Sequence, residues 1–109
     1  MKVINTILLT SSIVLASCAT PDKLSPPFEA AGKECVEGRT TIDEALPCLS
    51  ERGLNMNRIL WKDNLYIYSS SKCRPSSAIF VFACSGLSII VGEKGEIQRW
   101  NVSKGYDGP

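Results

Sequence analysis

Four cysteines, Cys35, Cys48, Cys73 and Cys84, constrain the fold of this chain more than any other feature, and a fifth, Cys18, stands apart near the N-terminus. The four later cysteines can form two disulfides in three different ways. None of their spacings is the C-x-x-C of zinc sites or thioredoxin-like sites. Disulfides persist in exported proteins and are rare in the cytosol. Whether these cysteines pair therefore depends on whether the chain is exported.

The N-terminal segment has the layout of a secretory signal. Lys2 is followed by VINTILLTSSIVLA, residues 3–16, without a charge, and then by the small residue Ser17. A basic start, an apolar centre and small residues before the cleavage site are typical of such signals. The apolar stretch is too short and too rich in Ser and Thr for a transmembrane helix, which needs about 20 mostly apolar residues. We predict that residues 1–17 are removed and that the four later cysteines form two disulfides.

The last residues of this segment, Leu15-Ala16-Ser17-Cys18, resemble the lipobox of bacterial lipoproteins. The resemblance covers the first eighteen residues only, and it implies that Cys18 is acylated and becomes the new N-terminus. Several acyl chains on one cysteine make a stable membrane anchor. Ala19 stands where an aspartate would favour the inner membrane, which implies the periplasmic face of the outer membrane. The alternative is a conventional signal peptide whose Cys18 is incidental.

The rest of the chain has room for one small domain. Residues 18–27 are expected to be the lipidated cysteine and a flexible, Pro-rich tether, residues 28–104 a folded α+β domain, and residues 105–109 a C-terminal tail. Without Lys2, eleven basic residues balance eleven acidic ones. No run of Lys or Arg is present, so no nucleic-acid partner is expected.

Two short helices are predicted at the start of the domain. The first spans residues 26–37, with Ser25 as its cap, an apolar face formed by Phe28, Ala31 and Cys35, and Gly38 at its end. The second follows the capping-box pair Thr41 and Glu44 and ends at Gly53. Its apolar stripe comprises Ile42, Ala45, Leu46 and Leu49. Pro47 predicts a kink or a later helix start.

Antiparallel strands are predicted after a polar linker at residues 55–64. Residues 65–71 alternate between apolar and other side chains, and the turn-like GEKGE separates strands at 87–91 and 97–102. The apolar run at 78–84 could form a further buried strand. The expected fold class is α+β: two short N-terminal helices packed on one face of a three- or four-stranded antiparallel sheet, stapled by two disulfides.

Strand register discriminates between the disulfide pairings. If residues 65–71 paired with 78–84 as a hairpin, Cys73 would lie tens of ångströms from Cys84, whereas a disulfide requires Cα atoms within roughly 7 Å. If residues 65–71 instead pair with 86–92, Cys73 lies opposite Cys84. We favour this register, with residues 74–83 as a protruding lobe and with Cys35–Cys48 joining the helices. If residues 65–71 do not pair with 86–92, the four cysteines form another of the three possible sets of disulfides.

The order of elements behind the lipobox resembles the SmpA/OmlA (BamE-like) family of outer-membrane lipoproteins. The matching motifs are Gly38-Arg39-Thr40-Thr41, the positions Ala45, Leu49 and Gly53, the strand Leu65-Tyr66-Ile67-Tyr68, and the final LSIIVGEKGEIQRWNV. They fall within residues 28–102. Pro47 and the four cysteines depart from the family pattern. The resemblance implies an assembly or envelope-maintenance role.

Catalytic chemistry is not expected. The chain has no histidine, the usual general base and metal ligand. The adjacent acids Asp43 and Glu44 fit the negative charge that a helix N-terminus favours. We therefore expect no enzyme, no metal and no cofactor beyond the covalent lipid on Cys18.

Exposed aromatic and apolar side chains are the candidate interaction surface. Trp and Tyr are typical interface anchors, although strand aromatics also cover sheets as ordinary core. The expected function is a non-catalytic binding or structural component of the envelope, with the membrane and an envelope protein as partners. The alternative is a small inhibitor or immunity-type lipoprotein that binds a periplasmic enzyme or toxin. The candidate surface residues are Ile79, Phe80, Phe82, Tyr66, Tyr68 and Trp100.

Overall fold

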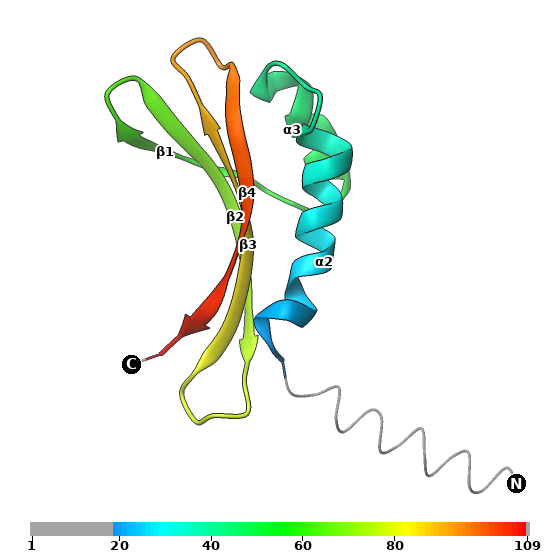
Figure 1. Ribbon diagram of the computed structural model, residues 1–109, viewed down its shortest axis with the longest axis vertical. Helices are drawn as coiled ribbons and strands as arrows, with labels where there is room; N and C mark the ends of the chain where they lie inside the picture. Colours follow the sequence, from blue (N-terminus) through cyan, green and yellow to red (C-terminus); the bar gives the residue numbers. More distant parts are fainter. Residues whose placement is uncertain (1–18, 109) are drawn as a thin grey trace, which may run out of the picture.

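The computed structural model describes residues 19–108, so the predicted signal peptide (1–17) and Cys18 lie outside the described residues. Helices and an antiparallel sheet form two layers (Figure 1). The α-helices are α2 (Pro21–Ala31) and α3 (Ile42–Glu51), and a π-helical turn, η1 (Gly32–Val36), extends α2. The strands are β1 (Asn57–Lys62), β2 (Leu65–Pro75), β3 (Phe82–Val91) and β4 (Ile97–Asp107).

Helix α2 begins earlier than its sequence pattern predicts. Pro21 occupies the first helical position, where its missing N–H costs nothing, and the Thr20 hydroxyl accepts a hydrogen bond from the Lys23 N–H at 3.4 Å. Ser25 is therefore not the cap, and it is buried inside the helix. The expected flexible tether at 18–27 is wrong for residues 21–27, which are helical.

The predicted apolar face of the first helix is confirmed. Phe28, Ala31 and Cys35 are all buried in the core. Gly38 follows the helical segment with φ of +83°, a left-handed conformation that glycine adopts without steric cost. The helical segment therefore ends where the sequence places its end.

Helix α3 begins at Ile42 and runs through Pro47 without the expected delay. Glu44 takes part in the predicted cap differently from a standard capping box, because its carboxylate accepts hydrogen bonds from the hydroxyls of Thr40 and Thr41. This helix packs mainly on η1 rather than on the strands. The helical layer is thus one long segment with a smaller second helix. Its buried residues are Ile42, Ala45 and Leu49.

The sheet has four strands in the order β1-β2-β3-β4, all antiparallel. Strand β1 replaces part of the predicted polar linker. The apolar run at 78–84 is not a strand of its own, because β3 is continuous from Phe82 and residues 76–81 form the β2–β3 loop. Strand β4 continues to Asp107, so most of the predicted C-terminal tail is paired with β3.

Both predicted disulfides are present. Cys73 lies directly opposite Cys84 in the β2–β3 register, with Cα atoms 4.1 Å apart. Cys35 and Cys48 join η1 to α3. The predicted lobe at 74–83 is shorter than expected, because Pro75 still pairs with Phe82.

Side chains of β3 alternate between the two faces of the sheet. One face lies under α2 and contributes the core residues, whereas no helix within residues 19–108 covers the other face (Figure 1). The buried β3 residues on the helix side are Ala83, Ser85, Leu87, Ile89 and Val91.

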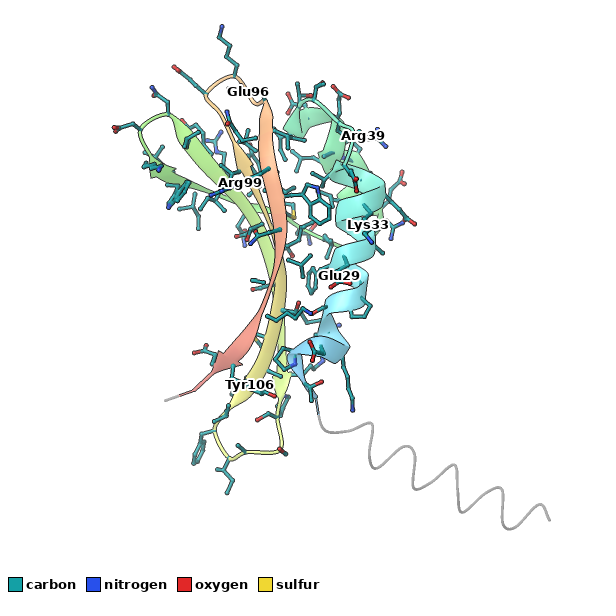
Figure 2. The ribbon with its side chains drawn as sticks, viewed as in Figure 1. Glu29, Lys33, Arg39, Glu96, Arg99 and Tyr106 are labelled. Atoms are coloured by element: carbon teal, nitrogen blue, oxygen red, sulfur yellow. A yellow bond between two sulfur atoms is a disulfide. The ribbon has the colours of Figure 1, made fainter. Side chains whose placement is uncertain are left out.

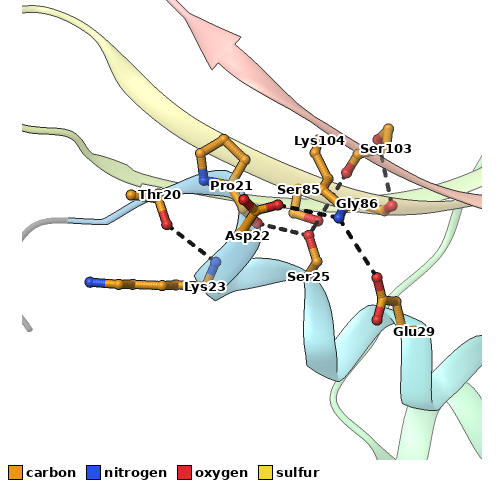
Figure 3. Close-up of polar contacts among 10 residues, drawn as sticks. All are labelled: Thr20, Pro21, Asp22, Lys23, Ser25, Glu29, Ser85, Gly86, Ser103 and Lys104. Atoms are coloured by element: carbon orange, nitrogen blue, oxygen red, sulfur yellow. Dashed lines mark hydrogen bonds and ion pairs between the residues drawn. The ribbon is translucent and has the colours of Figure 1, made fainter.

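A buried chain of hydroxyl groups joins the start of α2 to the sheet (Figure 3). The Ser25 hydroxyl donates to the Pro21 carbonyl oxygen at 2.7 Å and lies 3.0 Å from the Ser85 hydroxyl, which donates to the Ser103 carbonyl oxygen. The Lys104 ammonium adds an exposed ion pair with Asp22 at 3.2 Å. These contacts fix the N-terminal end of α2 against β3 and β4.

Candidate functional site

The structure does not gather the six predicted surface residues in one place. Tyr68 and Trp100 lie on the helix side of the sheet and pack against the core. The Trp100 indole fills the space where a side chain on Gly32 would stand. These two aromatic side chains therefore belong to the core between the sheet and the helices, which was the alternative to an interaction surface.

Tyr66 lies near the β1–β2 turn, at the other end of β2 from Pro75. It is partly buried, and the Arg58 guanidinium lies 5.0 Å from the centre of its ring. Such cation–π contacts contribute about 0.5–1 kcal/mol at exposed sites. Tyr66 is thus separate from the remaining candidates.

The other three predicted residues do come together, at the β2–β3 end of the molecule. The exposed fractions are 81% for Ile79, 78% for Phe80 and 45% for Phe82. Tyr106, in the predicted tail, is 63% exposed and lies at the same end (Figure 2). We call these four residues the apolar tip.

Hydrogen bonds around Ser76 hold the loop of the apolar tip in one shape. The Ser76 N–H and hydroxyl both donate to the Val81 carbonyl oxygen, at 3.0 and 2.6 Å. The Ala78 N–H in turn donates to the Ser76 hydroxyl at 3.2 Å. The Val81 N–H closes a four-residue turn by donating to the Ala78 carbonyl oxygen at 3.3 Å. Ile79 and Phe80 are the two central residues of this turn.

Phe80 has a left-handed backbone conformation, with φ of +62°. The third position of such a turn normally carries Gly or Asn, because a side chain with a Cβ is strained there. A large aromatic residue at this position is therefore held against its local preference. Backbone outliers of this kind cluster at functional sites.

A second exposed apolar group lies on β1, which the sequence analysis interpreted as a polar linker. The exposed fractions are 58% for Ile59, 64% for Leu60 and 44% for Trp61. The register shift between Leu60 and Lys62 places a bulge at Trp61. The short apolar run in NRILWK, residues 59–61, was the available signal, and the polar residues on either side of it led to the linker interpretation.

Ile59 belongs to an apolar row on the face of the sheet opposite the helices. Ile59 pairs with Ile67, and Ile67 pairs with Ile90. Because Ile89 and Val91 point into the core, Ile90 and its cross-strand neighbours point away from it. We call Ile59, Ile67 and Ile90 the open-face row.

The described residues offer no metal centre: across residues 19–108, no group of three or more His, Cys, Asp or Glu side chains is placed to hold a metal ion. The four later cysteines are all bonded in disulfides. Within the same range, no helix is both long and apolar enough to cross a bilayer.

Comparison with protein-family models, with curated proteins and with solved structures yields no match to this chain.

Proposed function

We propose that this protein is a membrane-anchored lipoprotein that faces the periplasm and acts as a non-catalytic binding component of the cell envelope. The anchor is the acylated Cys18, and the outer membrane is its location. The role is of the BamE-like assembly or envelope-maintenance kind. In this proposal both helices cover one face of the sheet and leave the other face to a protein partner.

The observation that supports a binding role is the open-face row. Ile59, at the edge of this row, is more than half exposed, and Ile67 and Ile90 are only partly buried. Antiparallel sheets usually pair an apolar face over the core with a polar face in water. A cross-strand row of isoleucines on the outer face is instead typical of a surface that another protein covers.

Fractionation of cells tests the anchor. Replacing Cys18 by Ser removes the acylated thiol, so the Cys18→Ser chain is expected as an unprocessed precursor or as a soluble product. The unsubstituted chain is expected in the outer-membrane fraction. Recovery of a processed Cys18→Ser protein in the membrane fraction would show that the anchor is not at this cysteine.

A pull-down from solubilised membranes separates the proposed role from its alternative. An envelope-assembly or cell-wall protein that co-purifies supports the structural role, whereas a single soluble enzyme or toxin supports an inhibitor or immunity-type lipoprotein. Ile59→Ser is the informative variant, because Ile59 is exposed and contributes little to the core. Capture is expected to fall with Ile59→Ser and to persist with Ile79→Ser, a change in the apolar tip.

A further inference from the structure

Ala19, the residue that follows the proposed anchor Cys18 in the sequence, lies at the same end of the molecule as the apolar tip. The Ala19 N–H donates a hydrogen bond to the carbonyl oxygen of Pro75, the last residue of β2. Ala19 is bonded to Cys18, and Pro75 pairs with Phe82 of the apolar tip. Figure 1 shows the start of α2, the β2–β3 loop and the end of β4 at one end, with the β1–β2 turn at the other.

The folded domain begins almost directly at the anchor. Helix α2 starts at Pro21 and is capped by Thr20, so the first helical residue follows Cys18 by three positions in the sequence. Three extended residues span at most about 10 Å. A bilayer that holds acyl chains on Cys18 therefore lies against the β2–β3 end of the domain.

The apolar tip presents apolar surface from several directions. Ile79 and Phe80 extend from the loop, while Phe82 and Tyr106 lie on opposite faces of the sheet, because the strand neighbour of Tyr106 is the buried Ala83. A protein that docks on a flat sheet covers one face. Side chains around an entire end suit insertion into a fluid apolar phase, and tyrosine favours the boundary between lipid and water.

The tip is already in its final shape. Ser76 holds the loop, and the Cys73–Cys84 disulfide joins the two strands directly behind it. Insertion would therefore order few additional groups. Phe80 occupies a left-handed turn position that favours Gly or Asn. The turn conformation therefore does not explain why a phenylalanine stands at this position.

We propose that the apolar tip enters the same bilayer that anchors Cys18, so that the domain stands on the membrane by its β2–β3 end. This inference rests on the proposed lipid anchor. The exposed cations Lys72 and Arg74 lie on β2 next to the tip, at the level of phospholipid head groups. The same end carries the acids Asp107 and Asp22, and Asp22 is paired with Lys104. The open-face row then faces sideways and is free to bind a protein.

Tryptophan fluorescence measures whether the tip is in lipid. The full lipoprotein carrying Phe80→Trp is purified and reconstituted into vesicles of phosphatidylethanolamine and phosphatidylglycerol, with or without bromine on the acyl chains. Emission from residue 80 should shift to shorter wavelength and be quenched by the brominated chains. The unsubstituted protein supplies the background from Trp61 and Trp100.

Leu60→Trp is the matched control. Leu60 is 64% exposed, comparable to Phe80, but lies next to the β1–β2 turn at the far end of the domain. Its emission should remain that of an indole in water, without quenching by bromine. Equal quenching at both positions would overturn the proposal, as would photo-cross-links in cells that join residue 80 to a protein rather than to lipid.

Phe80→Asn separates insertion from folding. Asparagine tolerates the left-handed conformation, so the variant should unfold at the same temperature as the parent or higher. An adjacent reporter, Ile79→Trp, should lose most of its quenching by brominated chains when combined with Phe80→Asn. Unchanged quenching would show that the Phe80 ring does not hold the tip in lipid.

Whether Cys18 is acylated in the same samples distinguishes a failure of tip insertion from a failure of the proposed anchor. A tip that remains in water on an acylated protein contradicts only the present inference. An unmodified Cys18 in the N-terminal peptide contradicts the proposed anchor, and the quenching data would still show whether the tip enters added vesicles.

Discussion

Gly32 and Trp100 form a close approach between the helical layer and the sheet. The Trp100 ring occupies the position where a Cβ on Gly32 would lie, and Gly32 is buried at the junction of α2 and η1. Only glycine lets the helix backbone lie directly on an indole ring. Trp100 was expected on a candidate interaction surface, because the sequence alone does not show which strand residue faces a distant glycine.

Gly32→Ala is therefore expected to destabilise the protein. Overpacking costs roughly 1–3 kcal/mol, and the middle of this range exceeds the ~1 kcal/mol that alanine gains over glycine in a helix. The free energy of unfolding in urea should fall by about 1 kcal/mol. Gly105→Ala is the control, since no atom lies within 4 Å of its added Cβ. A Gly32→Ala protein as stable as the parent would show that the indole moves aside without cost.

At the scale of elements, the β2–β3 pair was the most predictable part of the fold. Alternation in LYIYSSS and the distance limit of a disulfide together favoured the register that places Cys73 opposite Cys84, and the structure has this register. The start of α2 was not predictable in the same way, because Pro26 and Pro27 imitate a first helical turn although they lie inside the helix. Local patterns locate a strand pair when a covalent bond limits its geometry, and they leave helix ends ambiguous.

The two disulfides should contribute unequally to stability. They close loops of similar length, with sequence separations of 13 and 11, so their effects on unfolded-chain entropy are nearly equal, about 3 kcal/mol each. Cys35 is fully buried, whereas Cys73 is exposed. Cys35→Ala/Cys48→Ala adds a core cavity to the entropy loss. Urea unfolding should show a larger loss for this variant than for Cys73→Ala/Cys84→Ala, and the reverse order would contradict the assignment of the core.

Over the whole molecule, the surfaces differ in the side chains that they carry. One face of the sheet makes the core with the helices, the opposite face carries the open-face row, and the β2–β3 end carries the apolar tip beside Ala19. The sequence indicated the α+β class and three of the four tip residues. It did not indicate Tyr106 or the exposed apolar residues 59–61 of β1. Their place on the surface depends on which strand ends lie together in space.

The proposed lipid anchor is tested by the intact mass of the protein purified from the membranes of its own cells. The expected mass is that of residues 18–109 with two disulfides and with a diacylglyceryl group and acyl chains on Cys18. A chain that begins at another residue, or that begins at Cys18 without added lipid, would contradict it.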